Sequence, residues 1–183
     1  MGTTPSEAHP LYPKEERQEI FSGRLLRVVV DEVNSPDGSH FNRELVFHPR
    51  AVAIMPILPN GRILLVQQYR HAVETSLWEI PAGLLELEET PIACAQRELL
   101  EETGYEAKQW EERLSFYTSP GFTNEEVTLF FAHDLVKTAD PLPEEITVCN
   151  AFTPDELFTL IKSGHIKDAK TILALELLGR QAS

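Results

Sequence analysis

The sequence predicts a single α/β or α+β sandwich, and three observations support this fold class. Runs rich in β-forming residues occur along most of the chain, from IFSGRLLRVVVDEV (20–33) to ITVCNAF (146–152). Three helical segments occur among and after these strands in mixed order. The chain of 183 residues is of single-domain size and long enough to bury a substantial core.

The N-terminal part divides into an arm and a small β-segment. Residues 1–16 are polar and contain three prolines, which indicates a flexible arm. In the segment 17–49, the β-rich runs 20–33 and FNRELVFH (41–48) flank NSPDGSH, a turn-forming cluster, so we expect an antiparallel pair. This pair is small for a domain of its own.

The main domain is expected to span residues 50–183. AVAIMPIL (51–58) and RILLVQQYR (62–70), joined by the turn PNG, predict a second hairpin; its continuous apolar character places it centrally in a sheet. Further strands are predicted at RLSFYT (113–118), EVTLFFAHDLV (126–136) and ITVCNAF.

Capping residues set the helix limits. Thr90 and Pro91 are typical of an N-cap and a first helical residue, and Gly104 of a C-terminal stop, so a helix of about 13 residues lies between them. Thr153, Pro154 and Glu156 form a capping-box pattern that opens a helix to about residue 163. DAKTILALELLGR (168–180) supplies the last helix.

The composition excludes several classes of partner. There are 29 Asp and Glu against 16 Lys and Arg, a net charge of −13, and this acidic balance without a basic stripe argues against nucleic acid. No apolar run reaches the roughly 18 residues that span a bilayer, and the N-terminus lacks secretory features. We therefore expect a cytoplasmic protein without membrane partners. Cys94 and Cys149 have no metal-ligand or redox spacing and are expected to be reduced packing residues.

The segment RELLEETGY (97–105) concentrates negative charge on the first predicted helix. At about 100° per residue, Glu101 and Glu102 fall about 60° and 40° on either side of Glu98, so all three carboxylates share one face. One reading is a solvated acidic face. The other is a site for Mg²⁺, which prefers oxygen ligands and keeps several waters.

The wider spacing resembles the Nudix signature. In GLLELEETPIACAQRELLEETGY (83–105), nine positions are specified by that signature, and all match except the last, where Tyr105 replaces an aliphatic residue. The resemblance implies a Nudix α/β/α sandwich with a mixed β-sheet and an enzyme that hydrolyses a nucleoside diphosphate linked to another moiety. It also implies divalent metal, Mg²⁺ with Mn²⁺ as the alternative.

Site roles follow from the resemblance, position by position. Glu98 and Glu102 would be the principal metal ligands, Glu101 a direct or water-mediated ligand, and the backbone carbonyl of Ala82 a further one. The supporting residues would be Gly83 and Gly104 at tight turns, Glu89 as a brace of the loop, and Arg97 as the ion-pair partner that orients the glutamates.

The flanks resemble the ADP-ribose pyrophosphatase branch of the family. They are LWEIPAG (77–83) and SPGFTNE (119–125), with Pro120 lying 16 residues after Gly104. The branch implies that Arg70, in QYR, contacts the substrate and that Glu86 lies in the site. Without the resemblance, Arg70 would be a solvated strand end and Glu86 a loop charge. Relatives commonly carry Pro-Gly where this chain has Leu87 and Glu88, which leaves the turn before the helix without a residue suited to positive φ.

The sequence offers more than one candidate for the general base. The branch places an acidic residue of a mobile loop near the attacking water, and the matching loop ADPLPEEITV (139–148) offers Glu145 or its neighbour Glu144. Loop carboxylates are more often plain solubilising residues, and Glu101 is the alternative base.

The leading functional hypothesis is Mg²⁺-dependent hydrolysis of ADP-ribose to AMP and ribose 5-phosphate. A second keeps the chemistry with another nucleotide sugar or a dinucleotide, such as GDP-mannose or NADH. A third is a sensor that binds ADP-ribose without cleaving it. The branch also implies a homodimer formed through the N-terminal strands, which fits a β-segment that cannot bury its own faces.

Overall fold

The computed structural model describes residues 14–141 and 146–181. The chain forms two compact units. The first comprises the strands up to Pro49 together with Tyr117–Glu125, and the second comprises Arg50–Phe116 with the segment from Glu126 onward. The first unit thus includes a loop from the middle of the chain, which the predicted N-terminal β-segment did not contain.

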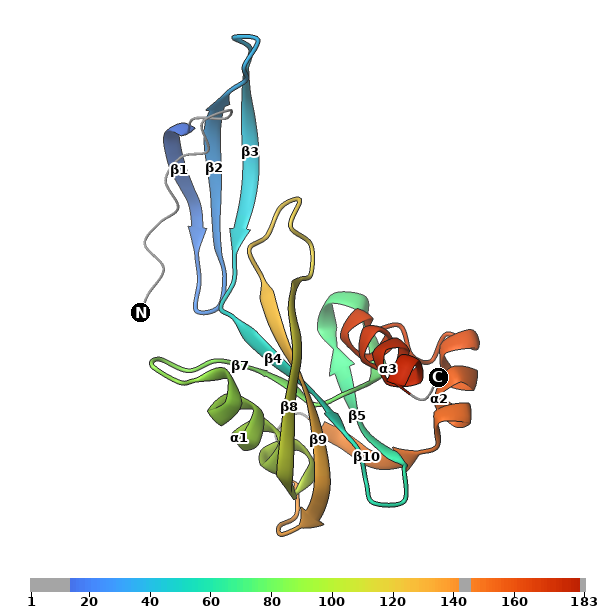
Figure 1. Cartoon of the computed structure of the whole chain (residues 1–183). Coiled ribbons are helices and arrows are strands. Elements are labelled where there is room, and N and C mark those ends of the chain that lie inside the picture. Colours follow the sequence, from blue (N-terminus) through green and yellow to red (C-terminus); the bar gives the residue numbers. More distant parts are fainter. Residues whose placement is uncertain (1–13, 142–145, 182–183) are drawn as a thin grey trace. The chain divides into compact units, whose positions relative to one another are not determined.

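The first unit is built on a three-stranded antiparallel sheet in the order β1-β2-β3 (Figure 1). Its strands are β1 (Lys14–Ser22), β2 (Arg27–Asn34) and β3 (His40–Phe47). The predicted antiparallel pair is present as β2 and β3, which pair from Arg27 with Phe47 to Asn34 with His40.

Two boundaries in this unit differ from the prediction. The run 20–33 is not one strand, because a turn closed by the Gly23 N–H and the Leu26 carbonyl, 2.9 Å apart, divides it between β1 and β2. Strand β1 also begins at Lys14, inside the range expected for the arm. The turn between β1 and β2 was not predicted because the residues around it are strongly β-forming and Gly23 was the one local turn signal.

The second unit contains two sheets. The first is mixed, in the order β7-β4-β9-β8, with β4 parallel to β9 and antiparallel to β7. The second is antiparallel, in the order β10-β5-β6. The strands are β4 (Ala51–Pro56), β5 (Ile63–Arg70), β6 (Thr75–Glu79), β7 (Ala82–Leu84), β8 (Tyr105–Tyr117), β9 (Glu126–Lys137) and β10 (Ile146–Phe152), with the 3₁₀ turn η1 (His71–Val73) between β5 and β6.

The predicted hairpin of β4 and β5 is wrong as a pairing. Between them, an isolated bridge joins Ile57 to Ile63 and the Leu58 N–H donates to the Arg62 carbonyl, but β4 and β5 themselves enter different sheets. Each is nonetheless central in its own sheet, as the apolar runs indicated. Every residue of β4 is buried, and its two edges are occupied by β7 and β9, so no edge remains for β5.

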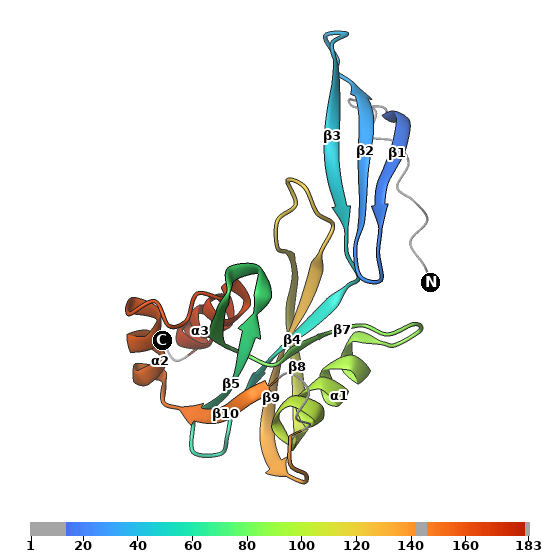
Figure 2. The ribbon, with the colours of Figure 1, turned by 180° about the vertical axis from the view of Figure 1, so that it is seen from behind.

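Helices cover both faces of the sheets, which confirms the α/β/α sandwich. They are α1 (Pro91–Thr103), α2 (Pro154–Lys162) and α3 (Ala169–Gln181). Figures 1 and 2 show α1 on one side of the strands and α2 with α3 on the other. Alternate residues of β4 divide accordingly: Met55 joins the core that includes Leu175 of α3, and Ile54 joins the core that includes Leu99 of α1.

The helix ends follow the predicted caps. The Thr90 hydroxyl accepts the Ala93 N–H at 3.3 Å, and Gly104 ends α1 in the left-handed region with φ of 74°, so the predicted 13-residue helix is confirmed. A Cβ at Gly104 would lie 2.1 Å from the Ala139 carbonyl oxygen. The capping box of Thr153 and Glu156 opens α2. None of the described helices has the length and apolar character needed to cross a membrane.

The loop before α1 carries backbone strain where the sequence departs from its relatives. Glu88 has φ of 63°, a conformation that a residue with a Cβ adopts at a cost. We expect Glu88→Gly to raise the free energy of unfolding by about 1 kcal/mol. Urea denaturation measures it.

Leu87→Gly is the matched control for this loop. Leu87 is almost fully exposed and is not among the described non-glycine residues with positive φ. Added backbone freedom in the unfolded chain should therefore lower its stability. If both variants change stability in the same direction, the strain at Glu88 is not the cause.

Candidate functional site

Arg97 is the centre of the charged cluster on α1. Its Nη1 donates to Glu98 Oε1 at 2.6 Å and to Glu101 Oε2 at 3.2 Å. Its Nε and Nη2 each donate to Glu89 at 3.0 Å, and Nη2 also donates to the Leu84 carbonyl at 3.1 Å. The guanidinium therefore joins the helix carboxylates to the loop that precedes the helix.

Glu89 links this cluster to the loop backbone. Its Oε2 accepts the Glu86 N–H at 2.9 Å, and the Glu89 N–H in turn donates to the Glu86 carbonyl. Hydrogen bonds from Arg97 lower the pKa of Glu89 to about 2. Glu89 is thus held as a carboxylate between the helix and the loop, the position that its expected bracing role requires.

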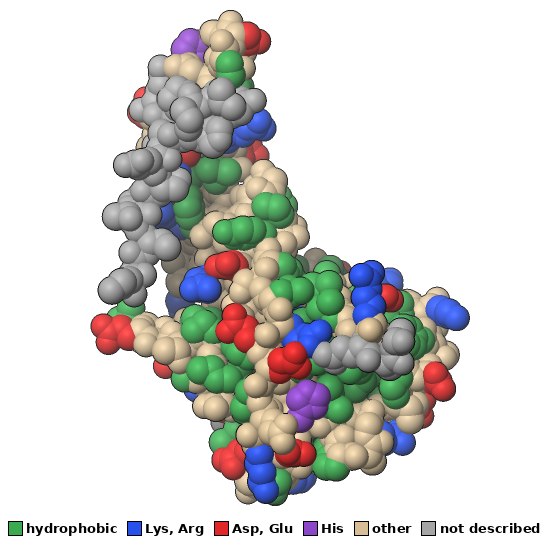
Figure 3. All heavy atoms as spheres, in the orientation of Figure 1, with side chains coloured by type: hydrophobic (Ala, Val, Ile, Leu, Met, Phe, Trp, Pro, Cys, Tyr) green, Lys and Arg blue, Asp and Glu red, His purple; other side chains and the backbone are tan. Residues whose placement is uncertain are grey.

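Glu98 and Glu102 form an under-compensated acidic pair. Burial, followed by the charge of Glu98, raises the pKa of Glu102 to about 8, although its Oε2 accepts the Ala82 N–H at 3.2 Å. Burial also raises the pKa of Glu98, against the opposing effect of Arg97. Acidic and basic side chains are interspersed over the face of the molecule that Figure 3 shows.

Gly83 allows the strand to pass directly against this pair. A Cβ at Gly83 would lie 1.9 Å from Cδ and Oε1 of Glu98, so a larger residue would displace that carboxylate. Gly83 is not among the glycines with positive φ, whereas Gly104 is. Of the two glycines expected at tight turns, Gly104 therefore has that role. Position 83 requires glycine because the backbone there lies against the Glu98 carboxylate.

The donor set fits a hard divalent cation. Glu98 and Glu102 are partly buried and hold their protons more tightly than usual, so they gain most from a nearby positive charge. Among the described residues, no three His, Cys, Asp or Glu side chains converge to hold an ion. A metal at Glu98 and Glu102 would therefore complete its shell with backbone oxygen, water and substrate, as Mg²⁺ usually does.

Glu101 is set apart from the pair. Its side chain is 40% exposed, and it shares Arg97 with Glu98. It is the most open of the carboxylates that Arg97 binds, since the side chains of Glu89 and Glu98 are each 13% exposed. This placement suits contact with water more than enclosure around a metal.

The two expected substrate-binding residues have different surroundings. Arg70 is no solvated strand end: its Nε and Nη2 donate to the two oxygens of Glu79 at 2.8 and 2.7 Å. Glu86 is exposed in the loop, and its N–H donates to Glu89. The exposed side chain is what the alternative interpretation, an ordinary loop charge, predicts. Glu144 and Glu145 lie outside the described residues.

Sequence reasoning missed Glu79, whose side chain is 2% exposed. Besides Arg70, its Oε2 accepts Lys170 Nζ at 3.3 Å. The available signal was an acidic residue between Trp78 and Ile80, because a carboxylate inside an apolar strand needs a charged partner.

The raised pKa of Glu102 predicts how stability depends on pH without metal. The folded state holds this proton up to about pH 8, whereas the unfolded chain releases it near the ordinary value of 4.5. The Glu102 contribution therefore falls as pH rises through this window, by at most about 1.4 kcal/mol per pH unit. Urea denaturation in the presence of EDTA measures the free energy of unfolding at each pH. We expect this free energy to fall with rising pH in the wild type relative to Glu102→Gln, because the variant has no carboxyl group to titrate at this position. Parallel profiles would contradict the assignment.

Gly83→Ala tests the close approach. The methyl group should displace the Glu98 carboxylate, so that Mg²⁺ no longer raises the melting temperature while the fold persists by circular dichroism. Gly179→Ala is the control, since a Cβ there meets nothing within 4 Å and alanine favours the helix. A normal Mg²⁺ response in Gly83→Ala would show that Glu98 does not hold the ion.

Comparison with known proteins agrees with this geometry. The NUDIX domain model matches residues 47–175. The chain is 43% identical over 167 residues to a methanol dehydrogenase activator of Bacillus methanolicus, covering 90% of each chain. It is 40% identical over 165 residues to an ADP-ribose pyrophosphatase of Bacillus subtilis (strain 168), covering 88% of this chain and 89% of that protein.

A solved structure described as an ADP compounds hydrolase has the same fold, with a TM-score of 0.84 over 96% of each chain at 20% identity. The family that the spacing around α1 indicated is therefore confirmed. This chain belongs to the Nudix family.

Proposed function

We propose that this chain hydrolyses the pyrophosphate bond of ADP-ribose, releasing AMP and ribose 5-phosphate, with Mg²⁺ as its metal and Mn²⁺ as a possible substitute. The observation that carries the proposal is the partly buried pair Glu98 and Glu102, whose raised pKa values suit a bound cation. Support for ADP-ribose comes from the pyrophosphatase of Bacillus subtilis, which aligns with 88% of this chain.

The described residues have distinct tasks in this proposal. Glu98, Glu102 and the Ala82 carbonyl would hold the metal, which would supply positive charge at the diphosphate and favour ionisation of water. Arg97 keeps Glu98 and Glu101 in place by hydrogen bonds of 2.6 and 3.2 Å. Arg70 and Glu86 contact the substrate.

Proton removal from water is assigned to a carboxylate near the pair. Glu101 is the described candidate, because it is the open carboxylate beside Glu98 and has Arg97 as its partner. Glu144 and Glu145 are the alternatives, in the loop that lies outside the described residues. A base must reach the water it deprotonates, and a loop can bring one there on closure.

The wider setting is also part of the proposal. The first unit exposes large apolar side chains, Ile20 at 55%, Phe21 at 56% and Leu25 at 47%, which a homodimer through the N-terminal strands would cover. The proposed domain limits keep the predicted boundary at residues 49 and 50, between a dimerisation segment and the Nudix domain at 50–183. The predicted arm at 1–16 is shortened, because β1 begins at Lys14. The net charge of −13 fits a cytoplasmic enzyme that acts on a small nucleotide rather than on nucleic acid.

A second candidate function is regulation of a partner protein. The Bacillus methanolicus relative is named for activating a methanol dehydrogenase and aligns with 90% of this chain. A protein of this kind could bind a nucleotide without cleaving it, as in the sensor hypothesis. The retained Glu98, Glu101 and Glu102 favour hydrolysis instead.

Turnover of a substrate panel tests the proposal. ADP-ribose, GDP-mannose, NADH and diadenosine compounds are compared with Mg²⁺ and then with EDTA. We expect the highest kcat/KM for ADP-ribose, with AMP as product, and a loss of several orders of magnitude in Glu102→Gln because the metal loses a ligand. Near wild-type activity in that variant would overturn the ligand assignment; another preferred compound would overturn only the substrate. Binding of ADP-ribose without turnover would favour the regulatory function.

A further inference from the structure

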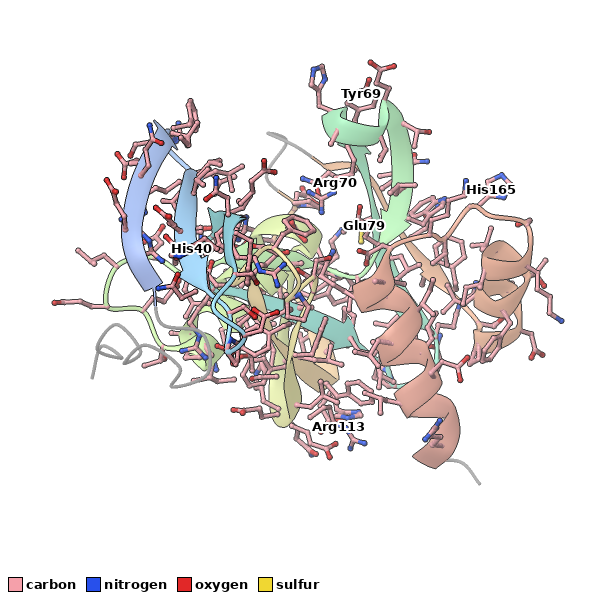
Figure 4. All side chains as sticks on the ribbon, turned by 90° about the horizontal axis from the view of Figure 1, so that it is seen from above. His40, Tyr69, Arg70, Glu79, Arg113 and His165 are labelled. Atoms are coloured by element: carbon pink, nitrogen blue, oxygen red, sulfur yellow. The ribbon has the colours of Figure 1, made fainter. Side chains whose placement is uncertain are left out.

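Glu79 lies buried at the centre of a charged cluster between β5, β6 and α3. Both of its oxygens accept hydrogen bonds from Arg70, at 2.8 and 2.7 Å, and Oε2 also accepts Lys170 Nζ at 3.3 Å. Figure 4 shows Arg70 and Glu79 close together, with Tyr69 of the same strand lying away from them. A carboxylate that is 2% exposed and bound by two cations has little freedom to move.

The start of α3 anchors this cluster from the other side. Lys170 pairs with Asp168 at 2.6 Å, and Asp168 accepts the N–H and the hydroxyl of Thr171 at 2.9 and 2.7 Å. The Thr171 oxygen in turn accepts the Ile80 N–H at 2.9 Å. Glu79 is thus fixed through its side chain, and its neighbour Ile80 is fixed through the backbone.

The geometry leaves Arg70 with donors to spare. Nε and Nη2 are used by Glu79, and Nη1 has no hydrogen-bond partner within the part of the chain that is described. The Arg70 side chain is 38% exposed, so an anion has access to it. Glu79, which binds Arg70, lies three residues before Ala82, whose N–H donates to Glu102 Oε2 at 3.2 Å. A short segment of the chain thus connects the partner of Arg70 to the acidic pair.

We propose that Glu79 is a positioning residue that acts through Arg70, holding its guanidinium ready for the diphosphate of the substrate. The inference rests on the proposed function, because it assumes that the substrate carries a diphosphate beside Glu102. An arginine side chain that is free to rotate loses rotamer entropy when it binds a ligand. The two hydrogen bonds to Glu79 restrict the Arg70 side chain before the substrate arrives, so less entropy is lost on binding. Lys170 stabilises Glu79 without contacting Arg70.

A double-mutant cycle on Arg70 and Glu79 tests this role. The variants are Arg70→Gln, Glu79→Gln and the two combined, measured for kcat and KM with ADP-ribose and for the Kd of ADP with Mg²⁺. We expect each single variant to raise KM and Kd about tenfold, the effect of one charge-assisted contact, with kcat nearly unchanged. The double variant should be no worse than Arg70→Gln, because Glu79 then has nothing to position.

Lys170→Gln is the matched control, since it removes a cation from Glu79 but keeps the two hydrogen bonds to Arg70. Its KM should stay near that of the wild type, and melting temperatures show whether each variant is folded. In Arg70→Gln, Glu79 retains Lys170 as a partner, which protects the fold. The inference is overturned if Glu79→Gln has the same effect in both backgrounds, or if it lowers kcat alone.

Failure of the proposed function gives a different result. If the wild type prefers another compound over ADP-ribose, the substrate is wrong, and the cycle is repeated with the preferred compound. If no compound is turned over, the Kd of ADP still reports whether the two residues are coupled. Additive effects on that Kd reject the positioning role whatever the substrate.

Discussion

The site depends on the guanidinium of Arg97, which neutralises part of an acidic helix face that would otherwise repel itself. Carboxylates one turn apart on a helix destabilise it by a few tenths of a kcal/mol for each pair. Arg97 offsets this repulsion for Glu98 and Glu101 while it binds Glu89 and the Leu84 carbonyl. One side chain thus fixes the direction of two helix carboxylates and the path of the loop before them.

Arg97 does not reach Glu102, and this asymmetry explains the chemistry of the pair. Glu98 has a cationic partner at 2.6 Å, and its pKa is still raised by burial. Glu102 has the Ala82 N–H, and its pKa rises to about 8. A fold that leaves two partly buried carboxylates short of positive charge gives up stability. A bound cation would restore it, and such trade-offs are typical of functional sites.

Local signals predicted the parts of this site that lie close in sequence. Thr90 and Gly104 gave both ends of α1, and the spacing from Gly83 to Gly104 gave the family. The partition of β4 and β5 into two sheets was not predicted, because two apolar strands joined by a short turn have the same sequence pattern whether or not they pair.

The cluster around Glu79 could not be predicted from the sequence, for a related reason. Glu79 and Lys170 are 91 residues apart, and no local pattern records that they meet. The pairing of Arg70 with Glu79 spans only nine residues, but it depends on the register in which β5 and β6 pair. Contacts set by sheet register and by helix docking emerge only once the elements are assembled.

The segment Glu79–Gly83 connects these two clusters. Towards α3, the side chain of Glu79 binds Lys170 and the N–H of Ile80 binds Thr171. Towards α1, the N–H of Ala82 binds Glu102 and Gly83 lies against Glu98. Because hydrogen bonds or close packing hold both ends of this short segment, a shift of α3 would be felt at the acidic pair. The last helix thus helps to hold the segment whose Ala82 N–H binds Glu102.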